Sequence, residues 1–213
     1  MNAVVLLGPP GSGKSTVSEV LGNKGYQHVS TGDMLRDQIR LKTQLGIKAG
    51  KLIDHGRFVS DEVAVGMIQE LLEGSDASAK FLFDGFPRTL SQVDSLNTMA
   101  KLFELQLDKV ILLECPDEVI IDRLSGRRSC DTCGTVYHIK YNPTARDGVC
   151  DIDGGNLVHR TDDTEYTIKK RLKVYSKRTA PLINYYKAKK LIHTIDATMS
   201  IDNVRDAALE QLN

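Results

Sequence analysis

The octapeptide Gly8-Pro9-Pro10-Gly11-Ser12-Gly13-Lys14-Ser15 matches the phosphate-binding pattern G-x-x-x-x-G-K-[ST]. A short, β-branched apolar run at 3–7 precedes it and predicts a strand buried on both faces. Residues 14–21 follow with apolar side chains at helical spacing, which predicts a helix opening at the loop. Glycines let backbone N–H groups converge on phosphate oxygens, Lys14 adds a positive charge, and Ser15 offers a hydroxyl to Mg²⁺. A glycine-rich turn without a ligand is the alternative, but the strand–loop–helix context favours a nucleoside triphosphate site.

Further apolar runs alternate with helical patterns along the chain. They predict strands at 3–7, 26–30, 80–83, 109–113 and 191–195. Helices are predicted at 14–21, 61–72, 90–99, 117–124, 164–186 and 201–212. This alternation predicts an α/β fold with a doubly wound, parallel, five-stranded sheet. Pro181 should kink or break the helix at 164–186, because proline lacks a backbone donor and clashes with the preceding turn.

Two stretches interrupt this alternation. Residues 30–59 carry helical patterns but no strand. Residues 126–163 are rich in Cys, Gly and Asp and contain short alternating segments, which predicts a small β-rich insert. The remaining residues, 1–29, 60–125 and 164–213, would then form one core around the phosphate loop.

The composition excludes several classes of protein. With 41% hydrophobic and 26% charged residues among 213, the chain is neither disordered nor fibrous. Its 28 basic and 28 acidic residues cancel, so it lacks the positive field of a duplex-DNA binder. Residues 169–190 hold nine Lys or Arg and no acid, but an apolar face beside them indicates the solvated side of a helix. No apolar run approaches the roughly 20 residues that span a bilayer, and no signal peptide is visible, so we expect a cytoplasmic protein without membrane contact.

Three cysteines and an aspartate have the spacing of a metal site. Cys130-x2-Cys133 is followed, 16 residues later, by Cys150-x2-Asp153. Paired knuckles at this separation are typical of structural zinc, since four protein ligands leave no open position for catalysis. The metal would stabilise an insert with little core of its own, and free thiols are the alternative. A disulfide would leave one of the three thiols unpaired. The alternatives for the fourth ligand are Asp151, His138 and His159.

Three further motifs decide which kind of nucleotide-binding protein this is. S-T-G-D-M-L-R occupies 30–36, D-G-F-P-R-T occupies 84–89, and D-R-L-x-G-R-R occupies 122–128. A guanine-reading N-K-x-D is incomplete at 23–26, where the aspartate is missing. With the phosphate loop, these motifs have the order and spacing of the adenylate kinases, and the resemblance covers essentially the whole chain. Some adenylate kinases also carry the C-x2-C-x16-C-x2-D pattern.

The resemblance implies reversible phosphoryl transfer from MgATP to AMP, giving two ADP. It also implies a P-loop core, an AMP-binding insert at 30–59 and a zinc-binding lid at 126–163. Catalytic roles would fall to Lys14, Asp84 (through Mg²⁺-bound water), Arg88, Arg123, Arg127, Arg160 and Arg171. ATP would contact Pro10, Gly11, Ser12, Gly13, Lys14, Ser15, Thr16, Arg127, Val136, Tyr137 and Met199. AMP would contact Thr31, Arg36, Arg57, Phe58, Val59, Gly85, Phe86, Pro87, Arg88, Gln92, Arg160 and Arg171.

These residue types suit the chemistry. The phosphate of AMP is already an anion, so transfer to it needs positioning and charge neutralisation rather than a general base. Arginine grips phosphate at two points through its planar fork. The chain departs from the family at Ser15, where glycine is more common, and at Met199, where lysine is frequent. We expect a monomer whose partners are ATP, AMP and ADP, with no nucleic acid.

Two other functions remain open from the sequence. Thr31 and Gln92, both suited to adenine, argue against a UMP/CMP kinase, as does the long lid. The alternative from another class is a zinc-ribbon module that uses ATP as a switch and contacts nucleic acid. Retention on heparin, or a steep salt dependence of RNA affinity, would support that alternative.

Overall fold

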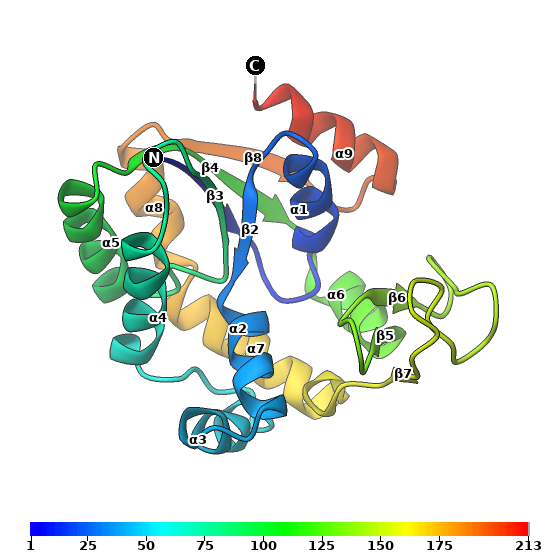
Figure 1. The fold of residues 1–213 in the computed structure, drawn as a ribbon. Helices are drawn as coiled ribbons and strands as arrows, with labels where there is room; N and C mark the ends of the chain where they lie inside the picture. Colours follow the sequence, from blue (N-terminus) through cyan, green and yellow to red (C-terminus); the bar gives the residue numbers. More distant parts are fainter. Residues whose placement is uncertain (213) are drawn as a thin grey trace.

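The computed structural model describes residues 1–212 and is built on a five-stranded parallel sheet (Figure 1). Its strands are β1 (Asn2–Leu7), β2 (Gln27–Ser30), β3 (Lys80–Asp84), β4 (Gln106–Glu114) and β8 (Ile192–Asp196). They lie in the order β2-β3-β1-β4-β8, and every neighbouring pair is parallel. The predicted α/β class and five-stranded sheet are confirmed, and all five carboxyl ends meet at one edge.

The core helices begin and end close to their predicted bounds. They are α1 (Lys14–Gly22), α4 (Asp61–Glu73), α5 (Leu90–Leu102), α6 (Asp117–Ser125), α7 (Glu165–Arg178), α8 (Pro181–Ala188) and α9 (Ile201–Glu210). Pro181 has the predicted effect, because the long basic segment divides into α7 and α8 just before it. Ile168, Leu172, Leu182 and Tyr186 of this segment are buried, and most of its basic side chains are exposed. None of the helices within residues 1–212 is long and apolar enough to cross a membrane.

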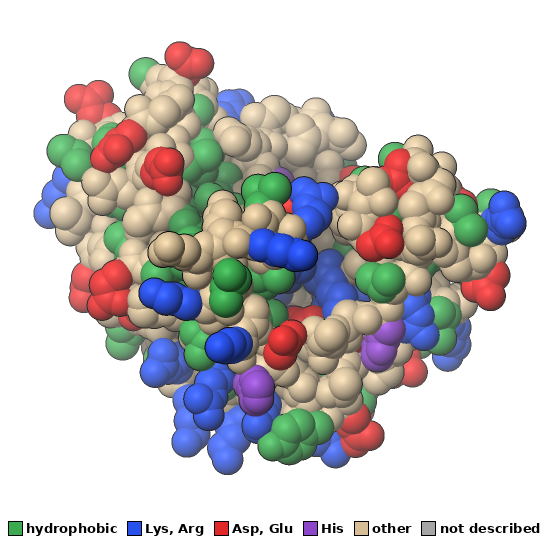
Figure 2. Space-filling view, turned by 60° about the horizontal axis from the view of Figure 1, so that its bottom comes forward, with side chains coloured by type: hydrophobic (Ala, Val, Ile, Leu, Met, Phe, Trp, Pro, Cys, Tyr) green, Lys and Arg blue, Asp and Glu red, His purple; other side chains and the backbone are tan. Residues whose placement is uncertain are grey.

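Two inserts lie beyond the carboxyl ends of the strands (Figure 1). The helical insert, residues 30–59, consists mainly of α2 (Thr31–Arg40) and α3 (Gln44–Ile53). The β-rich insert, residues 126–163, contains β5 (Arg127–Cys130), β6 (Val136–His138), β7 (Leu157–Val158) and the 3₁₀ turn η1 (Thr161–Asp163). Its three strands form a separate antiparallel sheet. Figure 2 shows a hollow between this insert and the rest of the molecule, with Lys and Arg side chains around it.

The two inserts touch each other directly. Nη1 of Arg40 in α2 donates to the carbonyl O of Thr132 at 2.9 Å. Oγ1 of Thr161 donates to Oδ1 of Asp54 at 2.8 Å, just after α3. The helical and β-rich inserts are therefore in contact with each other beyond the same edge of the sheet.

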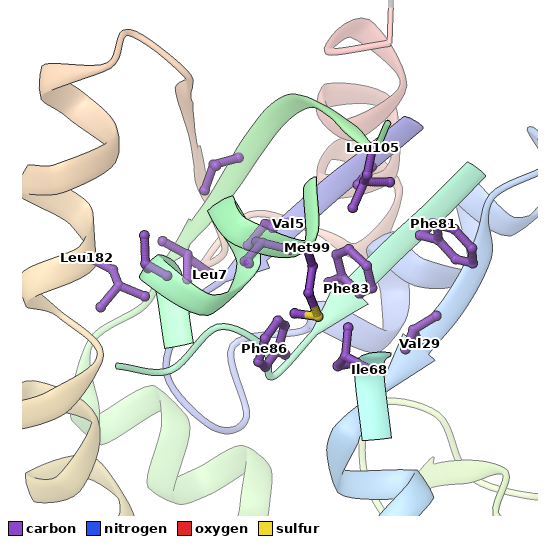
Figure 3. Close-up of a cluster of buried hydrophobic side chains, with 14 of the residues drawn as sticks. Val5, Leu7, Val29, Ile68, Phe81, Phe83, Phe86, Met99, Leu105 and Leu182 are labelled. Carbon is purple, nitrogen blue, oxygen red and sulfur yellow. The ribbon is translucent and has the colours of Figure 1, made fainter. Parts of the chain in front are cut away.

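The core lies on both faces of the sheet because β1 is apolar on both sides. Val5 and Leu7 point into one cluster, which includes Phe83 of β3 and Met99 of α5 (Figure 3). The alternate residues of β1, Val4 and Leu6, join a second cluster with side chains of α1 and α9. The strand alternation thus fixes β1 at the centre of the sheet, and with it the position of the loop that follows.

Candidate active site

The phosphate loop joins β1 to α1 in a shape that needs glycine. Gly11 and Gly13 have φ values of 80° and 95°, in the left-handed region that glycine adopts without strain. A Cβ on Gly11 would lie 2.7 Å from Cγ of Leu124. Gly13 is the N-cap of α1, so the free N–H groups of the helix open onto the loop. The backbone is therefore shaped to receive an anion.

Lys14 lies inside this loop. Its Nζ donates to the carbonyl O of Gly8 at 3.1 Å and of Pro9 at 2.9 Å. Burial lowers the pKa of Lys14 to about 8; the carboxylate of Asp84 opposes this shift, and Arg88 adds to it. A phosphate beside the ammonium would stabilise its charged form, since an opposite charge at short range offsets the cost of burial.

Asp84 ends β3 beside the loop and faces His28 of the neighbouring strand β2. Nε2 of His28 lies 3.5 Å from Oδ2 of Asp84. Burial alone would raise the pKa of Asp84, but the hydrogen bond from His28 and the charge of Lys14 outweigh it and leave this pKa below its ordinary value. The structure thus keeps an ionised carboxylate at the edge of the sheet. His28 was missed by sequence reasoning, because no local motif marks a strand neighbour.

A pocket lies between the carboxyl ends of β2 and β3 and the helical insert. Its lining includes nine residues expected at AMP: Thr31, Arg36, Arg57, Phe58, Val59, Gly85, Arg88, Gln92 and Arg171. Phe86 and Pro87, also expected there, are buried behind it, and Phe86 is part of the hydrophobic core. The predicted residues from four separate parts of the sequence therefore converge on one cavity.

Arg88 is fixed at the floor of this pocket. Its Nε donates to the carbonyl O of Gly85 at 2.7 Å, and Oγ1 of Thr31 donates to the same oxygen at 2.9 Å. The guanidinium lies 4.8 Å from the ring centre of Phe58. Burial lowers the pKa of Arg88 to about 10, against the opposing charge of Asp84. Gly85 must be glycine here, because its φ is 78° and a Cβ would lie 2.5 Å from Nη2 of Arg88.

The amide of Gln92 is held at the other side of the pocket. Its side chain is buried; Nε2 donates to Oδ1 of Asp61 at 2.8 Å, and Oε1 accepts from the backbone N of Arg88 at 2.7 Å. Oγ1 of Thr89, the N-cap residue of α5, donates to Oδ2 of Asp61 at 2.9 Å. Asp61 was not among the residues predicted from the sequence.

Two buried acids of η1 hold the arginines of the β-rich insert and α7. Nε and Nη2 of Arg127 donate to the two carboxylate oxygens of Asp163 at 2.7 and 2.6 Å. Nη1 of Arg171 donates to Oδ1 of Asp163 at 3.0 Å and to the backbone O of Asp162 at 3.1 Å. Sequence reasoning missed both acids; the available signal was their place two and three residues after Arg160.

Arg160 lies close to this group. Its Nε donates to Oγ of Ser129 at 2.7 Å. Burial, together with the neighbouring charges of Arg127 and Arg36, lowers the pKa of Arg160 to about 9. Arg36 forms an ion pair with Asp33 at the rim of the pocket. Cations from α2, β5, α7 and the end of the β-rich insert thus gather at one place, which favours a bound polyanion.

The residues expected at the adenine of ATP come from separate elements. Nη2 of Arg123 donates to the carbonyl O of Ala197, two residues before Met199. Tyr137 in β6 turns its hydroxyl away, toward Sγ of Cys150 at 3.4 Å. The same hydroxyl accepts from the backbone N of Asp151 at 3.0 Å, so it is held within the β-rich insert.

The four residues of the predicted metal site come together in the β-rich insert. One ligand atom from each of Cys130, Cys133, Cys150 and Asp153 lies within 4.8 Å of all the others. None of the three rival ligands belongs to this group; Asp151 accepts from the backbone N of Ala145, and Nδ1 of His138 accepts from the backbone of Lys140 and Tyr141. Three sulfurs and a carboxylate at this spacing could hold a metal ion.

Comparison with known proteins gives one answer. The profile of the adenylate kinase family, described as "Adenylate kinase", matches residues 6–191. An adenylate kinase of Clostridium botulinum (strain 657 / Type Ba4) is 47% identical over 202 residues, and one of Clostridium perfringens (strain SM101 / Type A) is 44% identical over 202 residues. Each alignment covers 94% of this chain and 94% of the relative. The chain therefore belongs to the adenylate kinase family and is a nucleoside monophosphate kinase.

Proposed function

We propose that this chain catalyses MgATP + AMP ⇌ 2 ADP and that the residues gathered at the carboxyl edge carry it out. The observation that supports this most is the placement of a phosphate loop and a second pocket on the same edge, with Arg88 and Arg171 lining that pocket. The charges of both arginines also lower the pKa of Lys14, which supports a single polyphosphate site shared by the three groups. ATP would bind at the loop and AMP in the pocket.

The AMP site of this proposal is the pocket beneath the helical insert. Arg36, Arg88 and Arg171 would hold its phosphate, with Arg160 beside them. Thr31, Gln92 and the backbone at 57–59 would surround the base, and Gly85 would let it approach the chain closely. Phe86 and Pro87 shape this wall from behind.

The ATP site of the proposal runs from the phosphate loop to the β-rich insert. Residues 10–16 would wrap the phosphates through their backbone N–H groups. Arg123 and Arg127 would contact the phosphates from α6 and β5. Val136, Tyr137 and Met199 would border the adenine by their backbones, so that methionine at 199 does no harm.

The chemical step needs no base from the protein. An AMP oxygen attacks the terminal phosphorus of ATP, and ADP leaves. The negative charge on the transferring group must be neutralised and the two nucleotides held in line. Lys14, Arg88, Arg127, Arg160 and Arg171 supply that charge.

Magnesium fits this site. Asp84 is an ionised oxygen ligand at the edge of the sheet and Ser15, which is exposed at the start of α1, offers a hydroxyl. Both are the hard donors that Mg²⁺ prefers. Bound Mg²⁺ would neutralise part of the phosphate charge, with Asp84 acting through water.

The metal cluster of the β-rich insert fits structural zinc. Three thiols and Asp153 fill four positions, so the ion would stabilise the insert rather than take part in transfer. Purified protein should hold about one Zn²⁺ per chain, and Cys130→Ser should lose the metal and melt earlier while keeping part of its activity. A Cys130→Ser protein that retains a full equivalent of metal, or melts with the wild type, would contradict structural zinc.

We further propose that residues 30–59 and 126–163 close over a core made of 1–29, 60–125 and 164–213. The hydrogen bonds from Arg40 to Thr132 and from Thr161 to Asp54 support such closure. A monomer is supported because a single chain supplies every residue assigned to both nucleotides. A reducing, cytoplasmic setting is supported by four cysteines that form no disulfide within the described residues.

One assay tests the function. Equal concentrations of AMP, UMP, CMP and GMP are offered as acceptors with MgATP, and ADP formation is followed by a coupled reaction. We expect kcat/KM for AMP to exceed that for the pyrimidine nucleotides by orders of magnitude, as hydrogen-bonded sites allow. Comparable use of UMP or CMP would favour the UMP/CMP kinase instead. Absence of transfer together with salt-sensitive RNA binding would favour the ATP-switched module.

A further inference from the structure

The partners of Gln92 determine which way its amide points. Nε2 faces Oδ1 of Asp61, and Oε1 faces the backbone N–H of Arg88. A carboxylate can only accept hydrogen bonds, and a backbone N–H can only donate one. If the amide turned over, oxygen would face oxygen at Asp61 and N–H would face N–H at Arg88. The side chain is buried, so water could not relieve either mismatch.

Asp61 is itself held in place. It lies in the first turn of α4, and its second oxygen, Oδ2, accepts from the hydroxyl of Thr89. The Thr89 hydroxyl also accepts from the backbone N of Gln92, and this hydrogen bond caps the N-terminus of α5. One short network therefore ties the start of α4 to the start of α5 and to the amide between them.

Gln92 keeps one donor and one acceptor for a ligand. An amide offers two N–H donors and two lone pairs, and the protein uses one of each. Adenine presents an amino donor at C6 beside the acceptor N1. A 6-oxopurine, such as hypoxanthine or guanine, presents an acceptor at C6 beside the donor N1–H. The two patterns are mirror images, so one amide orientation can match only one of them.

We propose that Asp61, which does not line the pocket, is a positioning residue that makes the acceptor site select 6-aminopurines over 6-oxopurines. It does so by fixing the amide of Gln92 in a single orientation. This inference rests on the proposed function, since it assumes that the pocket holds the acceptor base. Asp61 acts on selectivity alone, because it lies behind Gln92 and away from the transferring phosphate.

The test compares AMP with IMP, whose base carries the 6-oxo pattern without the 2-amino group of guanine. In Asp61→Asn the asparagine can present either its oxygen or its NH₂ group to Gln92. When the Gln92 amide is turned over, that NH₂ group can donate to Oε1, so the oxygen–oxygen mismatch at position 61 disappears. We expect kcat/KM for IMP to rise roughly 10- to 100-fold, the effect of relieving one buried unpaired group. For AMP, kcat/KM should fall only as far as the amide divides its time between the two orientations, so the IMP/AMP ratio is the quantity that reports the change. Asp94→Asn, an exposed aspartate on α5, is the matched control and should leave both acceptors unchanged.

A second background separates positioning from general damage. In Gln92→Ala there is no amide to turn, so adding Asp61→Asn should leave the AMP/IMP ratio where Gln92→Ala put it. An unchanged ratio in Asp61→Asn alone, or an equal shift in both backgrounds, would overturn the inference. If Asp61→Asn does not fold, as judged by its thermal unfolding, Asp61→Ser serves instead, because a hydroxyl can also donate or accept. A wild-type enzyme that uses UMP or CMP as well as AMP would overturn the proposed function and this inference with it.

Discussion

Replacing Asp163 by asparagine should both destabilise the fold and slow phosphoryl transfer. The side chain of Asp163 has no exposed surface, and it accepts three hydrogen bonds from two arginines of the site. Arg127 donates two of these bonds, and Arg171 donates the third. Asparagine keeps the shape of the side chain but removes its charge, and its NH₂ group must face at least one of these N–H donors.

The magnitude follows from the partners that remain. Breaking a buried ion pair costs roughly 3–5 kcal/mol when the remaining charge has no other partner. Nη1 of Arg171 also lies 3.0 Å from Oδ2 of Asp162, and the Arg127 and Arg171 side chains are 16% and 21% exposed, so Asp162 and water replace part of the loss. We therefore expect a loss of about 2–3 kcal/mol. For a chain of this size that lowers Tm by about 4–12 °C.

Thermal unfolding and steady-state kinetics on the same preparations test this. Well below the melting temperature of the variant, kcat/KM for AMP should fall roughly 10- to 100-fold, because guanidinium groups that are no longer fixed lose their alignment with phosphate. Asp162→Asn is the matched control, since Asp162 forms its ion pair with Arg171 and its effects should be smaller on both measures. The reasoning would be refuted if Asp163→Asn melts at the same temperature as the wild type, or if it lowers Tm and kcat/KM less than Asp162→Asn does.

Lys14→Met should lower kcat by about 10²–10³-fold without unfolding the chain, because the ammonium acts where phosphate charge gathers. Near-normal turnover would show that Lys14 takes no part in phosphoryl transfer. Burial lowers the pKa of Lys14 from 10.5 to about 8, so the folded chain holds this proton less tightly than the unfolded chain. The free energy of unfolding should therefore rise as the pH increases from about 8 to 10.5. Urea unfolding at several pH values should show this gain in the wild type relative to Lys14→Met, and equal pH profiles would contradict it. The double variant Arg40→Ala, Thr161→Val removes both hydrogen bonds between the inserts. Limited proteolysis should then cut the β-rich insert faster, while the melting temperature of the core stays the same. Unchanged cleavage would mean that these bonds do not hold the inserts together.

The fold was predictable where its signals are local. The apolar run of β1, the glycines of the loop and the break at Pro181 each act within a few residues, and each prediction is confirmed. The start of β4 was not predictable in this way. It begins at Gln106, three residues before the predicted start, because the backbone there pairs with Asn2 and Ala3 although its side chains break the apolar pattern. Pairing with a distant strand, rather than local periodicity, sets that boundary.

The same distinction divides the site. Gln92 and Arg127 stand close to or within motifs and could be selected from the sequence alone. Their partners, Asp61 and Asp163, are 31 and 36 residues away along the chain, and nothing in the local pattern connects them. Residues expected to contact a ligand can be recognised from sequence motifs. The residues that orient those side chains can be recognised only from contacts in the folded structure.

Buried acids beside the site let a chain with no net charge gather several cations at one place. Burial lowers the pKa values of Lys14, Arg88 and Arg160, which shows that the fold alone compensates these charges incompletely. Asp84 opposes part of the positive charge of Lys14 and Arg88, and Asp163 accepts hydrogen bonds directly from Arg127 and Arg171. The positive charge that these acids leave lies on arginines such as Arg88 and Arg171, which line the second pocket, and a bound polyphosphate can neutralise it. The site is therefore electrostatically incomplete without its substrates, and their binding should stabilise the folded chain as well as align it for transfer.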